Sequence, residues 1–292
     1  MNTESVGKII KKYRILNSYT QAELAKGICT QAQISKLEKG TEIPSSIILY
    51  ELAKRLGISM ECFFEEEYTS AYIEDAISII RLLIRKRNYA EVYNIVQTEK
   101  KQDTFKTIEA QQFLLWHEGI CIYHLYKDKE KALELLNHAL YLTLHNEVWL
   151  KGREIEILNS IAIIHCECQE YNMAISIYTK LLNSITHTPL KDKNHIQIRV
   201  IYGLARTLTL SQNYKKSLFY TEQGIKQCIK IESLYLLGEL YYQKAYNLCF
   251  LNKKDKAIPI FKKALFIFES QNATEFIEHI KLNVKDFGIC LE

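Results

Sequence analysis

Apolar residues in the first 64 positions recur every three or four residues, in short blocks separated by polar residues. The blocks are Val6, Ile9, Ile10, Tyr13 and Leu16; Leu24 and Ala25; Ile34 and Leu37; and Ile47, Ile48, Leu52 and Leu56. This spacing is typical of amphipathic helices. The pattern predicts five short helices around one small core.

Capping and turn residues divide these blocks and set the ends of the helices. A Thr or Ser before a helix can cap it, and a Gly can supply the positive φ of a tight turn or a helix end. A helix, a tight turn and a second helix are therefore expected. The signals are a capping-box pair at Thr20 and Glu23, a turn glycine at Gly27, an N-cap at Thr30, a closing glycine at Gly40 and an opening serine at Ser45 or Ser46.

Beyond residue 68, amphipathic stretches follow one another as an internal repeat. Another small residue lies twelve positions before the last three repeat positions, and Gly119 lies near the matching place in the second. A repeat of this length predicts stacked helix pairs, and the run from Thr274 to Leu291 is expected to be a capping helix. The repeat positions, 40 to 43 residues apart, are Val92, Ala132, Ala174, Ser217 and Ala257, and the three earlier small residues are Ala162, Ala205 and Ala245.

Composition agrees with a helical chain of about two domains. The 292 residues are 48% hydrophobic, with only 10 Gly and 3 Pro. The chain opens with polar MNTES, and no apolar run approaches the roughly 20 residues of a membrane span, so we expect a cytoplasmic protein without a membrane partner. Eight cysteines scattered through such a chain are expected to be reduced, buried thiols.

The net charge of +4 lies entirely in the N-terminal segment. Residues 1–60 contain nine Lys or Arg against five Glu, and the remaining residues carry 29 charges of each sign. A positive excess confined to one segment favours a polyanionic partner for it.

The run YTQAELAKGICTQAQISKLEKGTEIPS resembles the helix-turn-helix of the phage-repressor type, with a turn one residue shorter than usual. In that geometry the start of the second helix faces base edges in the major groove, while short polar groups nearby meet phosphates. A double-stranded DNA partner is therefore expected. Base contacts are assigned to Gln31, Ala32 and Lys36, and the other DNA contacts to Gln21, Thr30, Ser35, Lys39 and Thr41.

The longer repeat resembles the tetratricopeptide repeat, in which the first helix of each pair lines a concave groove. The predicted fold is thus all-α: a phage-repressor-like helix-turn-helix domain followed by a tetratricopeptide-like α-solenoid. Arg, Tyr, Asn and Glu at inward positions suit an extended peptide. The predicted peptide contacts are Arg85, Lys86, His117, His124, Asn159, Arg199, Tyr202, Arg206, Glu239, Tyr242, Gln243 and Tyr246.

The whole chain resembles the PlcR type of peptide-sensing regulators from Gram-positive bacteria, in Ile28-Cys29-Thr30-Gln31, in QQFLLWH at 111–117 and in GELYYQ at 238–243. The resemblance implies a homodimer on a palindromic operator, activated in quorum sensing by a short re-imported peptide. It also implies that Asn159 grips the peptide backbone and that Arg85 and Lys86 receive acidic groups. Gly203 stands where the family has another asparagine. The expected domains are 1–66 for DNA binding, 67–73 as a linker, and 74–292 with about five repeats plus the capping helix.

Other functional classes have weaker support in the sequence. No Walker loop, zinc-protease motif or nucleophile elbow occurs, so we expect neither an enzyme nor a cofactor. His117, Cys121 and His124 share a helix but lack a fourth ligand, so no metal is expected. Two alternatives stay open: a redox-responsive regulator that uses cysteines such as Cys166 and Cys168, and a regulator controlled by a cytosolic protein partner.

Overall fold

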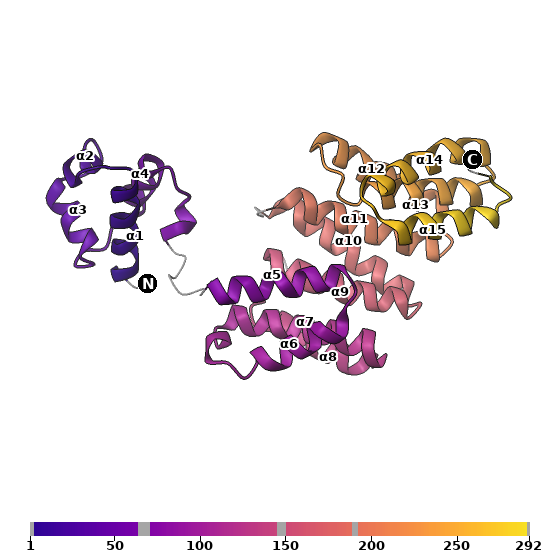
Figure 1. The fold of residues 1–292 in the computed structure, drawn as a ribbon, viewed down its shortest axis with the longest axis horizontal. Coiled ribbons are helices and arrows are strands. Elements are labelled where there is room, and N and C mark those ends of the chain that lie inside the picture. Colours follow the sequence, from indigo (N-terminus) through magenta and orange to yellow (C-terminus); the bar gives the residue numbers. More distant parts are fainter. Residues whose placement is uncertain (1–2, 64–70, 145–149, 189–191, 291–292) are drawn as a thin grey trace. The chain divides into compact units, whose positions relative to one another are not determined.

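The computed structural model describes residues 3–63, 71–144, 150–188 and 192–290, and every regular element in these ranges is helical (Figure 1). The all-α prediction is therefore confirmed. The chain divides into two compact units, 1–85 and 86–292. The predicted linker lies largely outside the described residues, and the boundary before residue 74 stays a prediction, since the first unit extends through one further helix.

The first unit holds the predicted helix-turn-helix. Its core is formed by residues from every apolar block, among them Ile10, Leu24, Ile34 and Leu52, which are fully buried. The fifth predicted helix is a short 3-10 helix, which ends in buried Phe63. The elements are α1 (Thr3–Leu16), α2 (Gln21–Ala25), α3 (Gln31–Glu38), α4 (Ser46–Leu56), η1 (Met60–Phe63) and α5 (Ala71–Arg85).

Local chemistry sets the ends of these helices as predicted. The Thr20 hydroxyl accepts from the Glu23 backbone N–H at 3.2 Å, and the Glu23 carboxylate accepts from the Thr20 N–H at 2.7 Å. Thr30 caps α3 in the same way, and Ser45 rather than Ser46 caps α4. Gly27 has φ +74°, so a side chain at this turn would be strained.

The second unit is a series of antiparallel helix pairs. Consecutive helices pack together, and the first helices of successive pairs, α7, α9, α11 and α13, also contact one another, whereas contacts between successive second helices are sparser. The stack therefore curves with the first helices inside. The elements are α6 (Tyr89–Glu99), η2 (Asp103–Phe105), α7 (Ile108–Tyr126), α8 (Lys129–Tyr141), α9 (Gly152–Glu167), α10 (Tyr171–His187), α11 (Lys193–Leu210), α12 (Tyr214–Lys230), α13 (Leu237–Phe250), α14 (Lys254–Ser270) and α15 (Thr274–Lys285).

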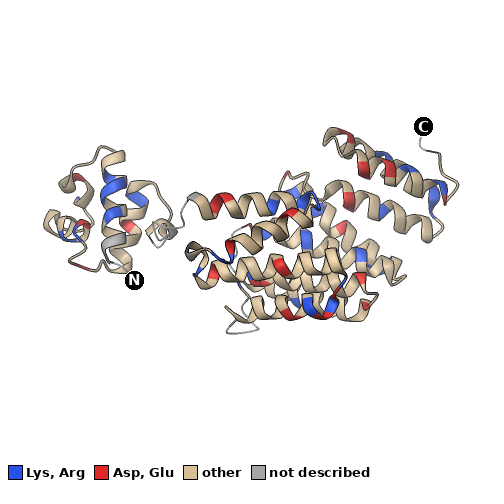
Figure 2. Cartoon of the chain, turned by 60° about the horizontal axis from the view of Figure 1, so that its bottom comes forward, with Lys and Arg blue, Asp and Glu red and all other residues tan. Residues whose placement is uncertain are grey.

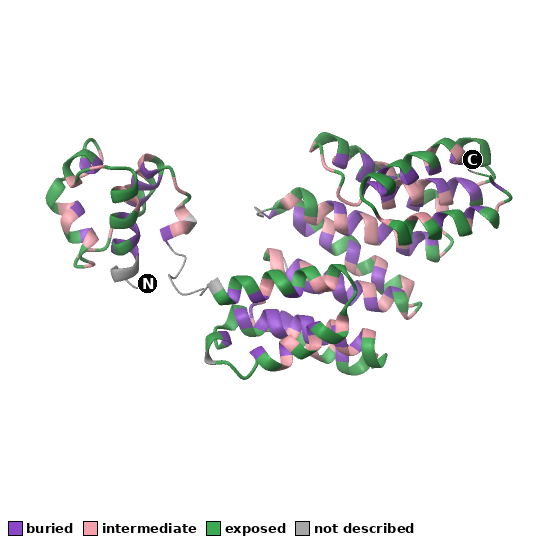
Figure 3. Cartoon of the chain, in the orientation of Figure 1, coloured by how far each residue is buried: buried purple, intermediate pink, exposed green. Residues whose placement is uncertain are grey.

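Small residues at the repeat positions lie where the helices cross. All eight, from Val92 to Ala257, are fully buried, and Figure 3 shows the buried positions running along the packed faces of the helices. α15 covers the end of the stack, as the capping-helix prediction requires. Small side chains at the repeat positions thus allow the helices to pack closely where they cross.

Polar side chains also lie inside the second unit, between α11, α12 and α13. Asn247 Nδ2 donates to Ser217 Oγ at 2.8 Å, and Ser217 Oγ donates to the Ala205 carbonyl oxygen at 2.7 Å. Gln243 Nε2 donates to Thr209 Oγ1 in the same cluster. These bonds satisfy groups whose burial would otherwise be costly.

The eight cysteines are all free thiols, and four of them, Cys121, Cys166, Cys228 and Cys249, are buried. Burial raises the pKa of the Cys121 thiol to about 12 and that of Cys228 to about 11. Because the thiolate is the reactive form, these residues are poor redox sensors. No helix in the described ranges has the length and apolar character to cross a bilayer.

Candidate functional site

The N-terminal end of α3 forms an exposed polar surface on the first unit. Ile34 and Leu37 hold the opposite face of α3 in the core. This fixed orientation turns the polar face outward. Of the predicted DNA contacts, Thr30, Gln31, Ala32, Lys36, Lys39 and Thr41 are exposed, and Gln21 and Ser35 are half-buried.

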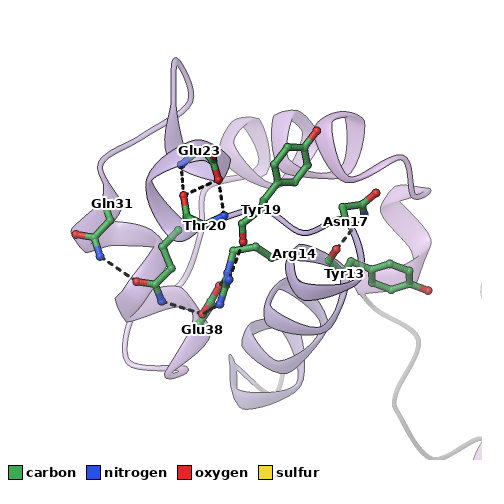
Figure 4. A network of polar contacts seen from close by, with 9 residues as sticks. Tyr13, Arg14, Asn17, Tyr19, Thr20, Glu23, Gln31 and Glu38 are labelled. Carbon is green, nitrogen blue, oxygen red and sulfur yellow. Dashed lines mark hydrogen bonds and ion pairs between the residues drawn. The ribbon is translucent and has the colours of Figure 1, made fainter.

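A chain of hydrogen bonds connects this surface to the core (Figure 4). Gln31 Nε2 donates to Gln21 Oε1 at 2.9 Å, and Gln21 Nε2 donates to Glu38 Oε2 at 2.9 Å. Glu38 Oε1 accepts from Arg14 Nε at 2.5 Å, and Arg14 also donates to the Tyr19 carbonyl oxygen at 2.9 Å. The Glu38 side chain is only 4% exposed.

The Glu38 carboxylate sets the direction of this chain because it can only accept hydrogen bonds. Gln21 must therefore turn its amide nitrogen to Glu38 and its oxygen to Gln31. Gln31 in turn gives one N–H to Gln21, which leaves its oxygen and second N–H for a ligand. A side chain held in this way loses little freedom on binding, which favours the recognition of one base edge.

Other polar groups at this surface have weaker constraints. Lys36 Nζ lies 3.6 Å from Glu42 Oε2 in an exposed ion pair, and the Thr41 hydroxyl donates to the Lys36 carbonyl oxygen at 3.1 Å. Exposed pairs of this kind contribute little, so Lys36 can exchange Glu42 for a ligand. Figure 2 shows further Lys and Arg on the first unit. Lys8, Lys11 and Lys12 of α1 are all exposed.

The inner helices of the second unit carry the candidate peptide contacts. We call the surface formed by Asn159 and Glu156 of α9, Arg199, Tyr202 and Arg206 of α11, and Glu239, Tyr242 and Tyr246 of α13 the inner face. A pocket of about 380 Å³ at the α9–α10 and α11–α12 turns shares no residue with it. The inner face is thus a surface of polar and aromatic side chains.

Part of the inner face is paired within the protein. Arg199 donates to Glu156 Oε1 at 2.9 Å and to the Tyr235 hydroxyl at 2.8 Å, so this predicted contact joins α9 to α11. Asn159, in contrast, is 7% exposed and its amide makes no hydrogen bond with any described residue. Asn159 is therefore a largely buried residue whose amide donors and acceptor are available to a ligand.

Aromatic residues close one end of the inner face. The Tyr242 ring lies 5.8 Å from Tyr246 and 5.7 Å from His279, and the Tyr242 hydroxyl accepts from Asn283 Nδ2 at 2.9 Å. Sequence reasoning missed His279 and Asn283, because it assigned α15 only a capping role. Their four-residue spacing on one face of α15 was the available signal.

Two predicted peptide contacts are buried in the structure. His117 is 2% exposed, and its ring packs on Phe113 and Trp116 with centroids 4.0 and 4.3 Å away. Gln243 belongs to the buried cluster with Thr209. Both side chains are part of the core and not of the inner face.

The remaining predicted contacts lie near the N-terminal end of the second unit or just before it. His124 is half-buried and stacks on Tyr89 at 4.1 Å, and burial lowers its pKa. Arg85 ends α5 in the first unit and Lys86 begins the second; both are exposed. His117, Cys121 and His124 do not form a metal site, since no group of three His, Cys, Asp or Glu in the described ranges could hold an ion.

Two family models match the chain. Residues 10–61 match a helix-turn-helix model, and residues 78–287 match the model of the RNPP family C-terminal domain. The chain belongs to the RNPP family. The family model covers the helices of the inner face, so the solenoid prediction is confirmed. No curated protein matches the chain.

Solved structures agree with this family. Bacillus thuringiensis PlcR in complex with the peptide PapR7 and DNA is 29% identical, with 95% of this chain and 99% of that chain covered and a TM-score of 0.85. Its apo form gives 28% identity, 95% and 98% coverage and a TM-score of 0.65. ComR from S. thermophilus, in complex with DNA and its signalling peptide ComS, is 15% identical over 97% of this chain and 100% of that chain, with a TM-score of 0.65, and shares the fold.

Proposed function

We propose that this RNPP-family chain is a cytoplasmic transcription regulator, and not an enzyme, whose binding to an operator is controlled by a short signalling peptide on the inner face. The observation that carries the proposal is the likeness of nearly the whole chain to PlcR, solved with a peptide and DNA. The exposed start of α3 and the open amide of Asn159 give each ligand a place to bind.

On DNA, Gln31, Ala32 and Lys36 are the residues for base edges. The other five residues fix the position of the helix-turn-helix on the phosphate backbone of the DNA: Gln21, Thr30, Ser35, Lys39 and Thr41. One helix-turn-helix of this size covers only one half-site of an operator. A homodimer on a palindromic duplex reads two half-sites and therefore gives useful specificity.

On the inner face, the proposed peptide contacts are the predicted residues other than His117 and Gln243, which pack in the core. Asn159 and Tyr202 offer hydrogen bonds to an extended backbone, and Tyr242 and Tyr246 offer aromatic surface to side chains. Further contacts are assigned to Arg85, Lys86, His124, Arg199, Arg206 and Glu239.

Replacing Gln31 with alanine tests the DNA assignment. We expect a loss of about 1–3 kcal/mol on the preferred duplex and relaxed preference at one base pair, because one bidentate contact disappears. The wild-type full chain is first used to select a preferred duplex from a random pool. Wild type and Gln31→Ala are then each titrated with selected and random DNA. Gln111→Ala, at an exposed glutamine of α7, is the control. An equal loss on both kinds of DNA would show that Gln31 reads no base.

A further inference from the structure

The inner face carries two charged groups that the protein itself leaves unpaired. Within the described part of the chain, neither Arg206 of α11 nor Glu239 of α13 takes part in an ion pair or a side-chain hydrogen bond with another residue. Both are only partly exposed. By comparison, Arg199, seven residues before Arg206 on α11, is hydrogen-bonded to Glu156 and Tyr235. The lack of partners is therefore particular to Arg206 and Glu239.

The phenol of Tyr202 lies within electrostatic reach of both groups. Burial raises the pKa of the Tyr202 phenol. The positive charge of Arg206 lowers this pKa, and the negative charge of Glu239 raises it further. Arg87, which is exposed in the turn after α5, also lowers the pKa of Tyr202. Tyr202 is thus near both a cationic and an anionic group of the inner face.

Leaving these charges without partners has a cost in the free protein. Burial raises the pKa of the Glu239 carboxyl, because the charged form is poorly solvated there, and a hydrogen bond from the residue's own backbone N–H offsets only part of this rise. Glu167 raises the pKa of Tyr178 and Arg206 lowers it, but the two side chains form no ion pair with each other in the described ranges. A ligand that supplies the two missing counter-charges would remove this cost, whereas a ligand with the wrong charge would increase it.

This proposal rests on the proposed function. We propose that the inner face selects a peptide with two opposite charges: a cationic group that pairs with Glu239 of α13 and a carboxylate that pairs with Arg206 of the neighbouring helix α11. The nearly buried amide of Asn159 holds the backbone between repeats. The cation is either a Lys or Arg side chain or the free N-terminal ammonium. A peptide that has an acetylated N-terminus and contains no Lys or Arg leaves Glu239 unpaired and is rejected.

A charge-reversal experiment tests this selection. Full-length wild type, Glu239→Lys and Arg206→Glu are each incubated with a random hexapeptide pool, and bound peptides are sequenced by mass spectrometry. Wild type is expected to enrich peptides that carry both a basic and an acidic group. Glu239→Lys is expected to replace the basic preference with an acidic one, and Arg206→Glu to do the reverse, each with a change of about tenfold or more in relative affinity. Acetylated and free N-termini in the pool distinguish ammonium from side-chain recognition.

Control variants separate charge recognition from loss of folding. Glu134→Lys makes the same reversal at an exposed residue of α8 and is expected to leave the selection unchanged. Glu239→Gln and Arg206→Gln, which remove a charge without reversing it, are expected to abolish one preference each. Identical enrichment for wild type and all reversals would overturn the charge proposal and leave the proposed function intact. Absence of any enriched peptide with wild type would overturn both.

Discussion

Replacing Glu38 with alanine is expected to destabilise the first unit by about 3–5 kcal/mol and to abolish selective DNA binding. The Glu38 side chain is 4% exposed, and it accepts from both Arg14 and Gln21. Its removal leaves a largely buried guanidinium without a counter-charge and frees the amides of Gln21 and Gln31 to rotate. Hydrogen exchange of α3 in the full chain measures the stability, and titration with selected and random duplexes measures the selectivity.

Glu42→Ala is the matched control for this experiment. Its carboxylate pairs with Lys36 at 3.6 Å, with the two side chains 35% and 63% exposed. An exposed pair of this kind contributes roughly 0–1 kcal/mol, so the control is expected to retain both stability and selectivity. Equal losses in the two variants would contradict the special role of the buried pair.

Replacing Gly203 with asparagine is expected to destabilise the second unit by about 1–3 kcal/mol and to give no gain in peptide affinity. A Cβ atom at Gly203 would lie 2.6 Å from ring atoms and the hydroxyl of Tyr178, whose side chain is fully buried between α10 and α11. An asparagine, which the family resemblance would imply at this position, therefore does not fit while Tyr178 is present. Thermal unfolding followed by circular dichroism measures the effect.

Tyr178→Leu combined with Gly203→Asn tests the cause of this loss. If the clash with the ring is responsible, the double variant is expected to lose less stability than the two single variants together. Tyr178→Phe is the control, because it removes the hydroxyl and keeps the ring. A Gly203→Asn protein as stable as wild type would show that α10 and α11 separate easily at this point.

Local chemistry made much of the first unit predictable. Thr20, Thr30 and Gly27 act on backbone atoms within a few residues, so their roles follow from spacing alone. The pairing of Arg14 with Glu38 spans 24 residues and depends on how α1 packs against α3. No periodicity shows such a contact. The chain from Arg14 to Gln31 therefore required the structure.

Repeat spacing predicted the core of the second unit but only part of its inner face. Small residues such as Ala162 and Ala205 must lie at helix crossings, whatever the exact register. The inner face is more sensitive, because one residue along a helix turns the side chain by about 100°. This is why Tyr242 lies on the inner face and Gln243 in the core. The burial of His117 could not be predicted for the same reason, since the spacing of the repeat positions varies between 40 and 43 residues.

If peptide binding controls operator binding, the peptide must change the affinity of the full chain for its selected duplex. This affinity is measured with and without a saturating peptide from the hexapeptide selection, by fluorescence anisotropy at constant salt, since salt alone changes DNA affinity. We expect a change of roughly 5–150-fold in the dissociation constant, with the same factor for peptide binding when DNA is present. A duplex affinity that stays the same at every peptide concentration would contradict control of operator binding by the peptide.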